Sequence, residues 1–429
     1  MRSFCILIVL AVIGCPSPAA ARDTLIELYR DLHPAPELSF HERQTARRLA
    51  AELRALDFEV TEGVGGHGIV GVLNNGDGPT LMLRADMDAL PIQEQTGFRY
   101  ASKVTTVDAD GNTVPVMHAC GHDVHMTVFI GTARKLVQQR DRWRGTLVMV
   151  GQPAEERGSG ARAMLADGLF KRFPRPDFNL ALHVNAALPV GTVGYTPGYA
   201  LASVDSVDIR VHGVGGHGAY PHTTRDPVVL SAQIINALQT LVSREIAPVE
   251  PGVVTVGAIH GGTKHNIIPD QVDLQLTVRA YSEDTRQKLL RGIERIARNQ
   301  ALAMGLPEDK LPTVSIKDEQ TRSTYNNPQL AERIAAVFAS TLGAEQVVTL
   351  PPVMGGEDFS EYGLQEPRIP SLIYWLGAVS QKKFDDAQAA SNALPSLHSP
   401  FFLPDAEPAI ATGVTAMTAA ALELLADAD

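Results

Sequence analysis

The hydrophobic residues of this chain follow two patterns that alternate along the sequence. Apolar residues recur at helical spacing between residues 23 and 56, as at Leu49, Leu53 and Leu56. Short continuous apolar runs follow, and such runs are typical of buried strands. We predict strands at 68–73, 80–83, 146–151 and 178–184, with helices at 124–138 and 160–170 between them. Strands that alternate with helices favour an α/β fold with a mainly parallel central sheet.

The pattern changes at about residue 200 to strand, helix, strand, strand, helix. These segments lie at 203–213, 226–243, 252–260, 272–282 and 283–304. A block of roughly a hundred residues is large enough for a small domain, and a chain of 429 residues exceeds what one hydrophobic core usually organises. We therefore predict an inserted α+β domain at 200–312, and a first domain built from 22–199 and 313–429 that ends in an Ala-rich helix at 406–426.

The first 21 residues have the pattern of an export signal peptide. Arg2 precedes an apolar run at 4–13, and small residues end at Ala21. The run is shorter than the roughly 20 residues that span a bilayer, and no later stretch reaches that length. We expect cleavage after Ala21 and a secreted or periplasmic protein without a transmembrane segment. Lipidation at Cys15 is the alternative, because residues 12–15 could place that cysteine at the start of the mature chain.

The composition excludes several classes of function. Hydrophobic residues make up 45% and charged residues 20% of the chain, which is ordinary for a globular protein. The formal charge of −11 becomes −12 when Arg2 is removed with the signal, so nucleic acid is not an expected partner. Cleavage after Ala21 would leave Cys120 as the one cysteine. No intramolecular disulfide could then form, and Cys120 needs another explanation.

Polar residues follow directly on three of the predicted strands. Asp86 and Asp88 follow the strand at 80–83, Glu155 and Glu156 follow the strand at 146–151, and His183 ends the apolar run at 180–182. In open α/β sheets, ligand sites gather outside the carboxyl ends of strands. We expect these side chains to converge, although they are far apart in the sequence.

A further polar group, His-Ala-Cys-Gly-His-Asp at 118–123, precedes the predicted helix at 124–138. Its Cys120 and His122, together with His183 and a glutamate, form a mixed set of sulfur, nitrogen and oxygen ligands that suits a divalent transition metal such as zinc. One of the adjacent glutamates can bind metal while the other takes a proton from metal-bound water and returns it to a leaving amine.

Each residue also has a simpler explanation when it is taken singly. A lone cysteine is usually a small core residue, adjacent glutamates are common in solvated loops, and Asp86 and Asp88 could cap a turn. The pattern His-x-Cys-Gly-His is more specific, because two metal-binding side chain types separated by glycine are seldom needed for packing. The joint occurrence of these groups at successive strand ends favours a metal site.

The motifs strongly resemble those of the N-acyl-L-amino acid amidohydrolases, the hippurate hydrolase and indoleacetyl-amino-acid hydrolase branch of the aminoacylase and carboxypeptidase G metallopeptidases. The resemblance runs from about residue 22 to the C-terminus. It implies a zinc-peptidase-like catalytic domain and a lid domain at 200–312 through which two subunits dimerise. The motifs are, in chain order, Arg-Ala-Asp-Met-Asp-Ala-Leu-Pro, His-Ala-Cys-Gly-His-Asp, Gln-Pro-Ala-Glu-Glu, Gly-Gly-His-Gly-Ala-Tyr-Pro-His, His-Asn-Ile-Ile-Pro-Asp and Gly-Gly-Glu-Asp-Phe-Ser.

The resemblance also implies roles for individual residues around two divalent ions, Zn²⁺ or Mn²⁺. Cys120 matches the ligand that bridges the two ions, and Glu155 matches the catalytic acid and base. Asp88 matches a carboxylate that orients a metal-bound imidazole. Asp86 stands where other branches of the family place a histidine ligand, so we leave it out of the ligand set. The implied metal ligands are Cys120, His122, Glu156, His183 and His398.

Three residues of the predicted lid match substrate-binding positions. His217 matches a residue that reaches the active site of the neighbouring subunit and helps to hold the tetrahedral oxyanion. Asn266 and Arg279 match positions that bind the substrate, where a guanidinium suits the carboxylate of an amino acid. Without the resemblance, Arg279 could form a surface ion pair and Asn266 could belong to a turn.

We therefore expect a hydrolase that cleaves the amide bond of N-acyl amino acids with acetyl, benzoyl, indoleacetyl or similar acyl groups. Water that bridges the two metals would attack the carbonyl, with Glu155 as general acid and base. One alternative is an exported dipeptidase or carboxypeptidase of the same fold that acts on short peptides. Another is a non-catalytic peptide-binding protein, against which the presence of every expected ligand and of the base argues.

Overall fold

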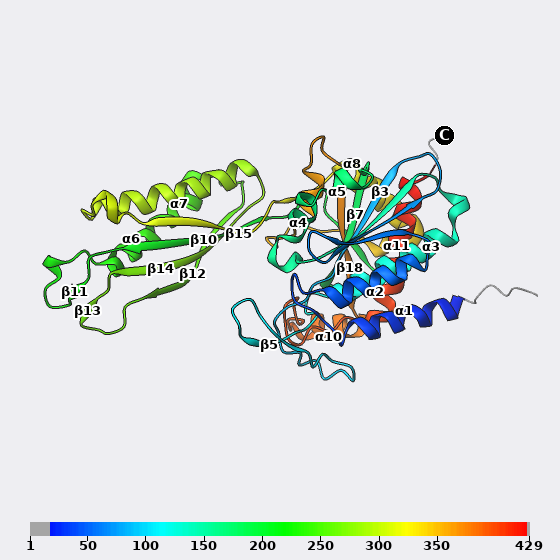
Figure 1. The fold of residues 1–429 in the computed structure, drawn as a ribbon, viewed down its shortest axis with the longest axis horizontal. Helices are drawn as coiled ribbons and strands as arrows, with labels where there is room; N and C mark the ends of the chain where they lie inside the picture. Colours follow the sequence, from blue (N-terminus) through cyan, green and yellow to red (C-terminus); the bar gives the residue numbers. More distant parts are fainter. Residues whose placement is uncertain (1–17, 427–429) are drawn as a thin grey trace, which may run out of the picture.

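The computed structural model describes residues 18–426, which form a larger and a smaller lobe (Figure 1). Most of the predicted export signal, including Cys15, lies outside the described residues, so localisation stays a prediction. Within 18–426, no helix is both long and apolar enough to cross a membrane.

An eight-stranded sheet forms the centre of the larger lobe. Its central strands β6, β3, β7 and β18 run parallel to one another, whereas β1, β2 and β6 pair antiparallel, as do β18 and β8. This arrangement confirms the predicted mainly parallel central sheet. From one edge to the other, the strands are β1 (Glu59–Val64), β2 (Gly68–Asn74), β6 (Thr146–Gln152), β3 (Thr80–Asp86), β7 (Phe178–Pro189), β18 (Ser371–Val379), β8 (Val193–Tyr195) and β17 (Val347–Thr349).

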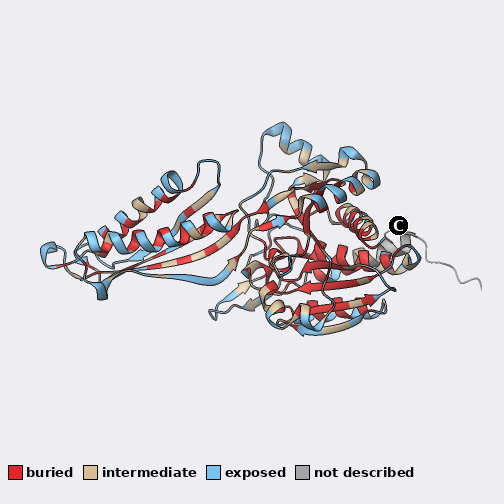
Figure 2. Cartoon of the chain, turned by 90° about the horizontal axis from the view of Figure 1, so that it is seen from above, coloured by how far each residue is buried: buried red, intermediate tan, exposed pale blue. Residues whose placement is uncertain are grey.

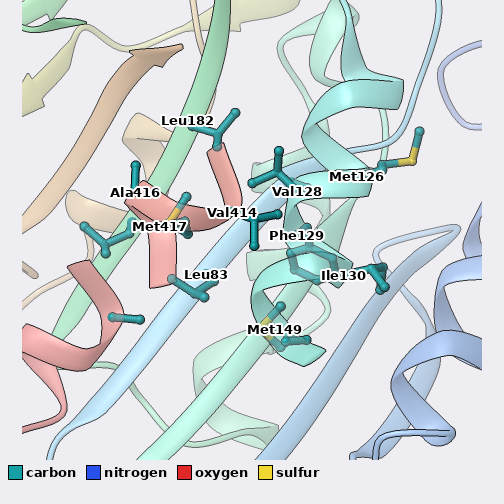
Figure 3. Packing of buried hydrophobic residues seen from close by; sticks show 14 of the residues in the cluster. Leu83, Met126, Val128, Phe129, Ile130, Met149, Leu182, Val414, Ala416 and Met417 are labelled. Carbon is teal, nitrogen blue, oxygen red and sulfur yellow. The ribbon is translucent and has the colours of Figure 1, made fainter. Parts of the chain in front are cut away.

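Helices cover both faces of this sheet because successive strand residues point to opposite sides. Leu81 and Leu83 of β3 pack into one hydrophobic cluster, whereas Met82 between them packs into another. Figure 3 shows Leu83 in the first cluster beside Phe129 and Val414. The helices of the first face are α1 (Pro18–Leu32), α2 (Arg43–Arg54), α3 (His122–Gln138), α8 (Pro328–Leu342) and α11 (Ala406–Leu424), and those of the second are α4 (Gly160–Ala166), α5 (Leu169–Arg172) and α9 (Ser360–Gly363).

Two predicted helices are each divided in the structure. The segment at 23–56 forms α1 and α2 with a connection at 33–42, because Pro34 and Pro36 cannot continue a helix. The segment at 160–170 forms α4 and α5, which are separated by Gly168 with a φ of 87°. A residue with this left-handed backbone ends the first helix.

The smaller lobe contains a four-stranded antiparallel sheet in the order β12, β14, β10, β15. Two helices pack their apolar residues against it to form a separate core, and Figure 2 shows that their outer sides are exposed. Burial alternates along β10 and β14, as expected for a sheet covered on one face. The elements are β10 (Ser203–His212), α6 (Pro227–Thr240), β12 (Gly252–Gly261), β14 (Gln271–Ala280), α7 (Glu283–Ala303) and β15 (Thr313–Thr321).

The smaller lobe extends past the predicted boundary at residue 312. The following strand, β15, pairs with β10 instead of returning to the first domain, so the sheet ends at Thr321. This strand is hard to assign from sequence because it lies at a sheet edge and most of its residues are polar and exposed. The chain re-enters the larger lobe at β16 (Thr324–Asn326), which pairs with β9 (Gly198–Leu201) where the chain leaves it.

Candidate metal centre

The carboxyl ends of β6, β3 and β7 meet at one edge of the central sheet, because these strands are adjacent and parallel. α3 begins at His122, directly after Gly121, whose φ of 77° turns the chain into the helix. The loop before α11 supplies His398 to the same edge. The structure therefore brings together seven of the predicted site residues: Asp88, Cys120, His122, Glu155, Glu156, His183 and His398.

Cys120 lies between two imidazole rings. Its Sγ is 3.4 Å from Nε2 of His183 and 3.2 Å from Nε2 of His398. Two groups of potential ligands share this sulfur, and within each group the ligand atoms lie within 4.8 Å of one another. One group comprises Cys120, His122 and His183, and the other comprises Cys120, Glu156 and His398. A thiolate at this place could serve two metal ions at once.

The backbone holds the two buried histidines so that Nε2 of each faces this centre. Nδ1 of His183 donates to the carbonyl oxygen of Val184 at 2.8 Å, and Nδ1 of His122 donates to the carbonyl oxygen of Asp88 at 2.8 Å. Such bonds fix the ring orientation and the tautomer of a metal ligand. The Asp88 carboxylate was predicted to orient an imidazole. Its Oδ1 lies 3.4 Å from His122 Nδ1, and its Oδ2 accepts the N–H of Glu156 at 3.0 Å.

The donor set fits divalent cations. His122 Nε2 and Glu156 Oε1 are both buried and have no hydrogen-bond partner within the described chain. Burial, followed by the charge of Glu156, raises the pKa of the Cys120 thiol well above its usual range. A coordinated cation removes both penalties, because it accepts the free lone pairs and stabilises the thiolate.

Glu155 lies beside the ligand groups in a cluster of buried carboxylates. One of its oxygens lies within 4.8 Å of oxygens of Glu357 and Asp358. Burial, followed by the charges of Glu357 and Glu156, raises the pKa of Glu155 well above its usual range. A carboxylate whose protonated form is stabilised in this way is suited to accept and release a proton as a general acid and base.

Sequence reasoning assigned no role to the charged residues behind Glu155. Arg84 is fully buried and donates to Asp86, Glu357 and Asp358 at 2.8, 2.8 and 3.2 Å. It thereby balances part of the negative charge of the site. The Glu-Asp pair in the Gly-Gly-Glu-Asp-Phe-Ser motif could have signalled this network, because buried carboxylates need partners.

His125 was also missed, although it follows His122 by about one helical turn. Its Nδ1 lies 2.7 Å from Asp86 Oδ1, and its Nε2 accepts the N–H of Val184 at 2.9 Å. Both ring nitrogens are therefore in use, so His125 holds Asp86 and is not free to bind a metal. The other oxygen of Asp86 accepts from Arg84 at 2.8 Å, so both oxygens of this carboxylate have hydrogen-bond partners.

A cavity of about 1080 Å³ opens beside the candidate ligands. Arg279 on β14 contributes to its wall and donates to the carbonyl oxygen of Met354 at 2.6 Å. His217 and Asn266 do not line this cavity. They lie together at the exposed tip of the smaller lobe, where Gly218 donates to the Asn266 carbonyl at 2.9 Å. The structure therefore separates these two predicted substrate-binding residues from the metal centre of their own chain.

The chain resembles proteins named as hydrolases over most of its length. Residues 82–423 match the peptidase family M20/M25/M40. Thermostable carboxypeptidase 2 of Saccharolobus solfataricus is 37% identical over 365 residues, covering 84% of this chain and 87% of that protein. N-acetylcysteine deacetylase of Bacillus subtilis is 37% identical over 359 residues, covering 82% and 88%. IAA-amino acid hydrolase ILR1-like 2 of Arabidopsis thaliana is 34% identical over 380 residues, covering 89% and 80%.

Solved structures share both lobes of the fold. A structure from methicillin-resistant Staphylococcus aureus has a TM-score of 0.82 and 32% identity, covering 95% of this chain and 97% of that one. The Bacillus subtilis YXEP protein, a dinuclear metal binding peptidase from the M20 family, has a TM-score of 0.77 and 31% identity, covering 95% and 99%. The chain therefore belongs to peptidase family M20/M25/M40, as a metal-dependent hydrolase of the amidohydrolase branch.

Proposed function

We propose that this protein hydrolyses the amide bond of N-acyl amino acids to a carboxylic acid and a free amino acid. The observation that carries the proposal is the position of buried Glu155 beside two ligand groups that share Cys120. The relatives named N-acetylcysteine deacetylase and IAA-amino acid hydrolase support this substrate class.

The two ligand groups would hold two divalent ions, with Zn²⁺ and Mn²⁺ as the candidates. One would be held by Cys120, His122 and His183, and the other by Cys120, Glu156 and His398. The ions would polarise the substrate carbonyl and lower the pKa of a water molecule.

The side chains supply the proton transfers and the orientation of the substrate. Glu155 takes a proton from the attacking water and passes it to the departing nitrogen, for which its raised pKa suits it. Arg279 lines the cavity and binds the carboxylate of the amino acid through its guanidinium. Asp88 accepts the backbone N–H of Glu156 and so fixes the loop that carries both glutamates.

The proposal includes a homodimer formed through residues 200–312. β12 is an edge strand of the smaller sheet, and Val228 and Val229 on α6 are exposed apolar residues. Unpaired edges and apolar surface favour association with another chain. Such a dimer would let the exposed His217 and Asn266 reach the cavity of the partner subunit, where His217 would help to hold the oxyanion. We also propose export to the periplasm or beyond through the signal at 1–21.

A peptidase acting on free-amine peptides is the second candidate, and a relative named as a carboxypeptidase favours it. Such a substrate carries an ammonium group, which an unpaired carboxylate in the cavity would bind. Apart from Glu155 and Glu156, the described cavity wall has one carboxylate, Glu319, and it is paired with Arg157 at 2.8 Å. Apolar residues such as Trp375 and Phe384 line the same cavity and suit an acyl group instead.

Amino acid release from a substrate panel tests the proposal. The purified, metal-loaded protein is incubated with N-acetyl, N-benzoyl and indoleacetyl amino acids and with free-amine dipeptides, with and without a chelator. We expect metal-dependent release from the N-acylated substrates. Release from dipeptides alone would establish the peptidase instead, and no release from a protein with two bound ions would favour a binding protein.

A further inference from the structure

The connection between α1 and α2 contacts the loop that carries Glu155. Glu42, at the start of α2, is fully buried, and its Oε1 accepts the N–H groups of Ala154 and Phe40, each at 2.8 Å. Its Oε2 has no hydrogen-bond partner among the described residues. Burying a carboxylate without a cation costs free energy. The burial of Glu42 therefore indicates a role beyond packing.

Both residues that donate to Glu42 have left-handed backbones. Phe40 has a φ of 62° and Ala154 a φ of 51°. Residues with a Cβ seldom adopt this conformation, and it persists only where the surrounding contacts enforce it. The carbonyl oxygen of Ala154 accepts N–H groups of Ser159 at 3.3 Å and Gly160 at 3.2 Å. The peptide groups on both sides of Ala154 are therefore held.

The same connection also holds the second loop of the site. Ser39 donates its hydroxyl to Asp88 Oδ2 at 2.6 Å, and the same oxygen accepts the N–H of Glu156 at 3.0 Å. The N–H of Ala89 donates to the carbonyl oxygen of Glu37 at 2.8 Å. Residues 37–42 thus link the loops that follow β3 and β6, from which Asp88 and Glu155 come.

We propose that Glu42 is a positioning residue for Glu155. Its Oε1 holds Ala154 in the left-handed conformation, and this turn determines where the side chain of the next residue, Glu155, begins. The proposal rests on the proposed function, in which Glu155 transfers the proton. Glu42 touches neither substrate nor metal and acts through the backbone of Ala154.

Two substitutions of Glu42 separate the effect of side-chain length from the effect of charge. Glu42→Gln keeps an oxygen at the same distance from the backbone and removes the charge, whereas Glu42→Asp keeps the charge and withdraws the oxygen by one methylene. Burial, followed by the charge of Asp88, raises the pKa of Glu42 to about 8. An uncharged acceptor is therefore a close substitute near neutral pH.

The experiment measures kcat, KM and bound metal for the metal-loaded variants. We expect Glu42→Gln to keep kcat within about threefold of the wild type, and Glu42→Asp to lower kcat about 10- to 100-fold, as loss of a positioning contact does. KM and the content of bound metal should stay unchanged in both. Adding Ala154→Gly to Glu42→Asp should recover part of kcat, because glycine adopts the left-handed conformation without strain.

Glu37→Ala is the matched control. The Glu37 carboxylate accepts from Gln44 N, Thr45 N and Thr45 Oγ1 in the first turn of α2, and it makes no side-chain hydrogen bond to the catalytic loops. We expect this variant to lose stability and to keep kcat. Glu37→Ala thus shows how a loss of stability in the same segment affects kcat when the contact with Ala154 is intact.

Wild-type kcat in Glu42→Asp overturns the inference, because the reach of the side chain would then not matter. A loss of kcat in Glu42→Gln as large as that in Glu42→Asp also overturns it, because an acceptor that keeps its reach should keep kcat. Loss of metal together with kcat also overturns it. These results leave the proposed function standing if the wild type releases amino acids and Glu155→Gln does not. If the wild type hydrolyses none of the substrates, the proposed function itself fails.

Discussion

His122 Nε2 and Glu156 Oε1 lie 3.8 Å apart, and both atoms are buried without a hydrogen-bond partner in the described chain. Burial opposes a charged His122, but the carboxylates of Asp86, Asp88 and Glu156 raise its pKa to about 10 in the metal-free protein. Protonation is one way to relieve this concentration of negative charge, and a divalent cation is the other. Metal and proton therefore compete for the same nitrogen.

The number of metal ions bound per chain in variants of the ligands should show that the two ligand groups share Cys120. We expect about two ions per chain in the wild type, about one in His398→Ala, and almost none in Cys120→Ala, because the sulfur belongs to both ligand groups. Elemental analysis after dialysis measures this. Thermal unfolding should shift in parallel, since a ligand at a thousandfold excess over its Kd stabilises by about 4 kcal/mol. Equal metal content in the two variants would contradict a bridging role.

Glu155→Gln should abolish turnover and leave the metal in place. The amide cannot accept a proton from water, and general acid and base catalysis contributes about 10²- to 10⁴-fold. We expect kcat to fall by at least about a thousandfold with two ions still bound. Stopped assays over hours and metal analysis of the same sample check both points. Activity like that of the wild type would remove Glu155 from the mechanism.

Arg279→Met should raise KM for substrates with a free carboxylate. A charge-assisted hydrogen bond is worth about 1.5 to 3 kcal/mol, which corresponds to about 10- to 100-fold in binding. Substrates whose carboxylate has been converted to an amide should bind the wild type and the variant alike. The measurement is KM of the wild type and of Arg279→Met for the carboxylate and amide forms of the same substrate. A similar loss for both forms would mean that Arg279 shapes the cavity wall without binding the carboxylate.

Phe384→Ala should lower the preference for large acyl groups. Phe384 lies on α10 (Gln381–Ala390), is half-buried and lines the cavity. We expect kcat/KM for N-benzoyl substrates to fall about tenfold relative to N-acetyl substrates, which is the effect of losing part of a buried apolar contact. Lys383→Ala, on the exposed side of the same helix, is the control. An unchanged ratio would place the acyl group elsewhere.

His33 should make the stability of the metal-free protein depend on pH. Burial lowers its pKa, but hydrogen bonds with Asp123 at 2.6 Å and Glu94 at 3.3 Å outweigh this and raise the pKa to about 9. Because this value exceeds the roughly 6.5 of the unfolded chain, the stabilisation is complete below about pH 6.5 and is lost as the pH rises through about 9.

The expected loss between pH 6 and pH 9.5 is about 3 kcal/mol, from about 1.4 kcal/mol per pKa unit. Urea denaturation of the wild type and of His33→Gln at the two pH values measures it. The variant should be less stable at pH 6 and should show a smaller change with pH. The same pH dependence in both proteins would assign the effect to other groups.

The sequence predicted the parts of the site that follow from strand order and from ligand chemistry. Glu155 and His183 could be located because each follows an apolar run, and the structure brings them together through adjacent parallel strands. His398 came from the family resemblance alone, since the loop that carries it has no regular pattern.

What the sequence did not reveal depends on contacts between distant segments. Glu42 has no sequence feature that distinguishes it from a solvated helix cap, and only the fold shows that it is buried against Ala154. Arg84 follows a predicted strand and would pass for a surface charge, yet it pairs with Glu357, which is 273 positions away. The edge strand β15 lacked the apolar alternation that identified β10 and β14.

β18 lies between β7 and β8 in the sheet but comes late in the chain, so the central sheet cannot be completed early in synthesis. Every strand of the smaller lobe precedes residues 371–379 in the chain, so until these residues are made the strand that joins β7 to β8 is missing. His398 follows later still, 19 positions after the end of β18. A nascent chain therefore cannot assemble both candidate ligand groups around Cys120 until the segment at 371–398 has been made and has joined the larger lobe.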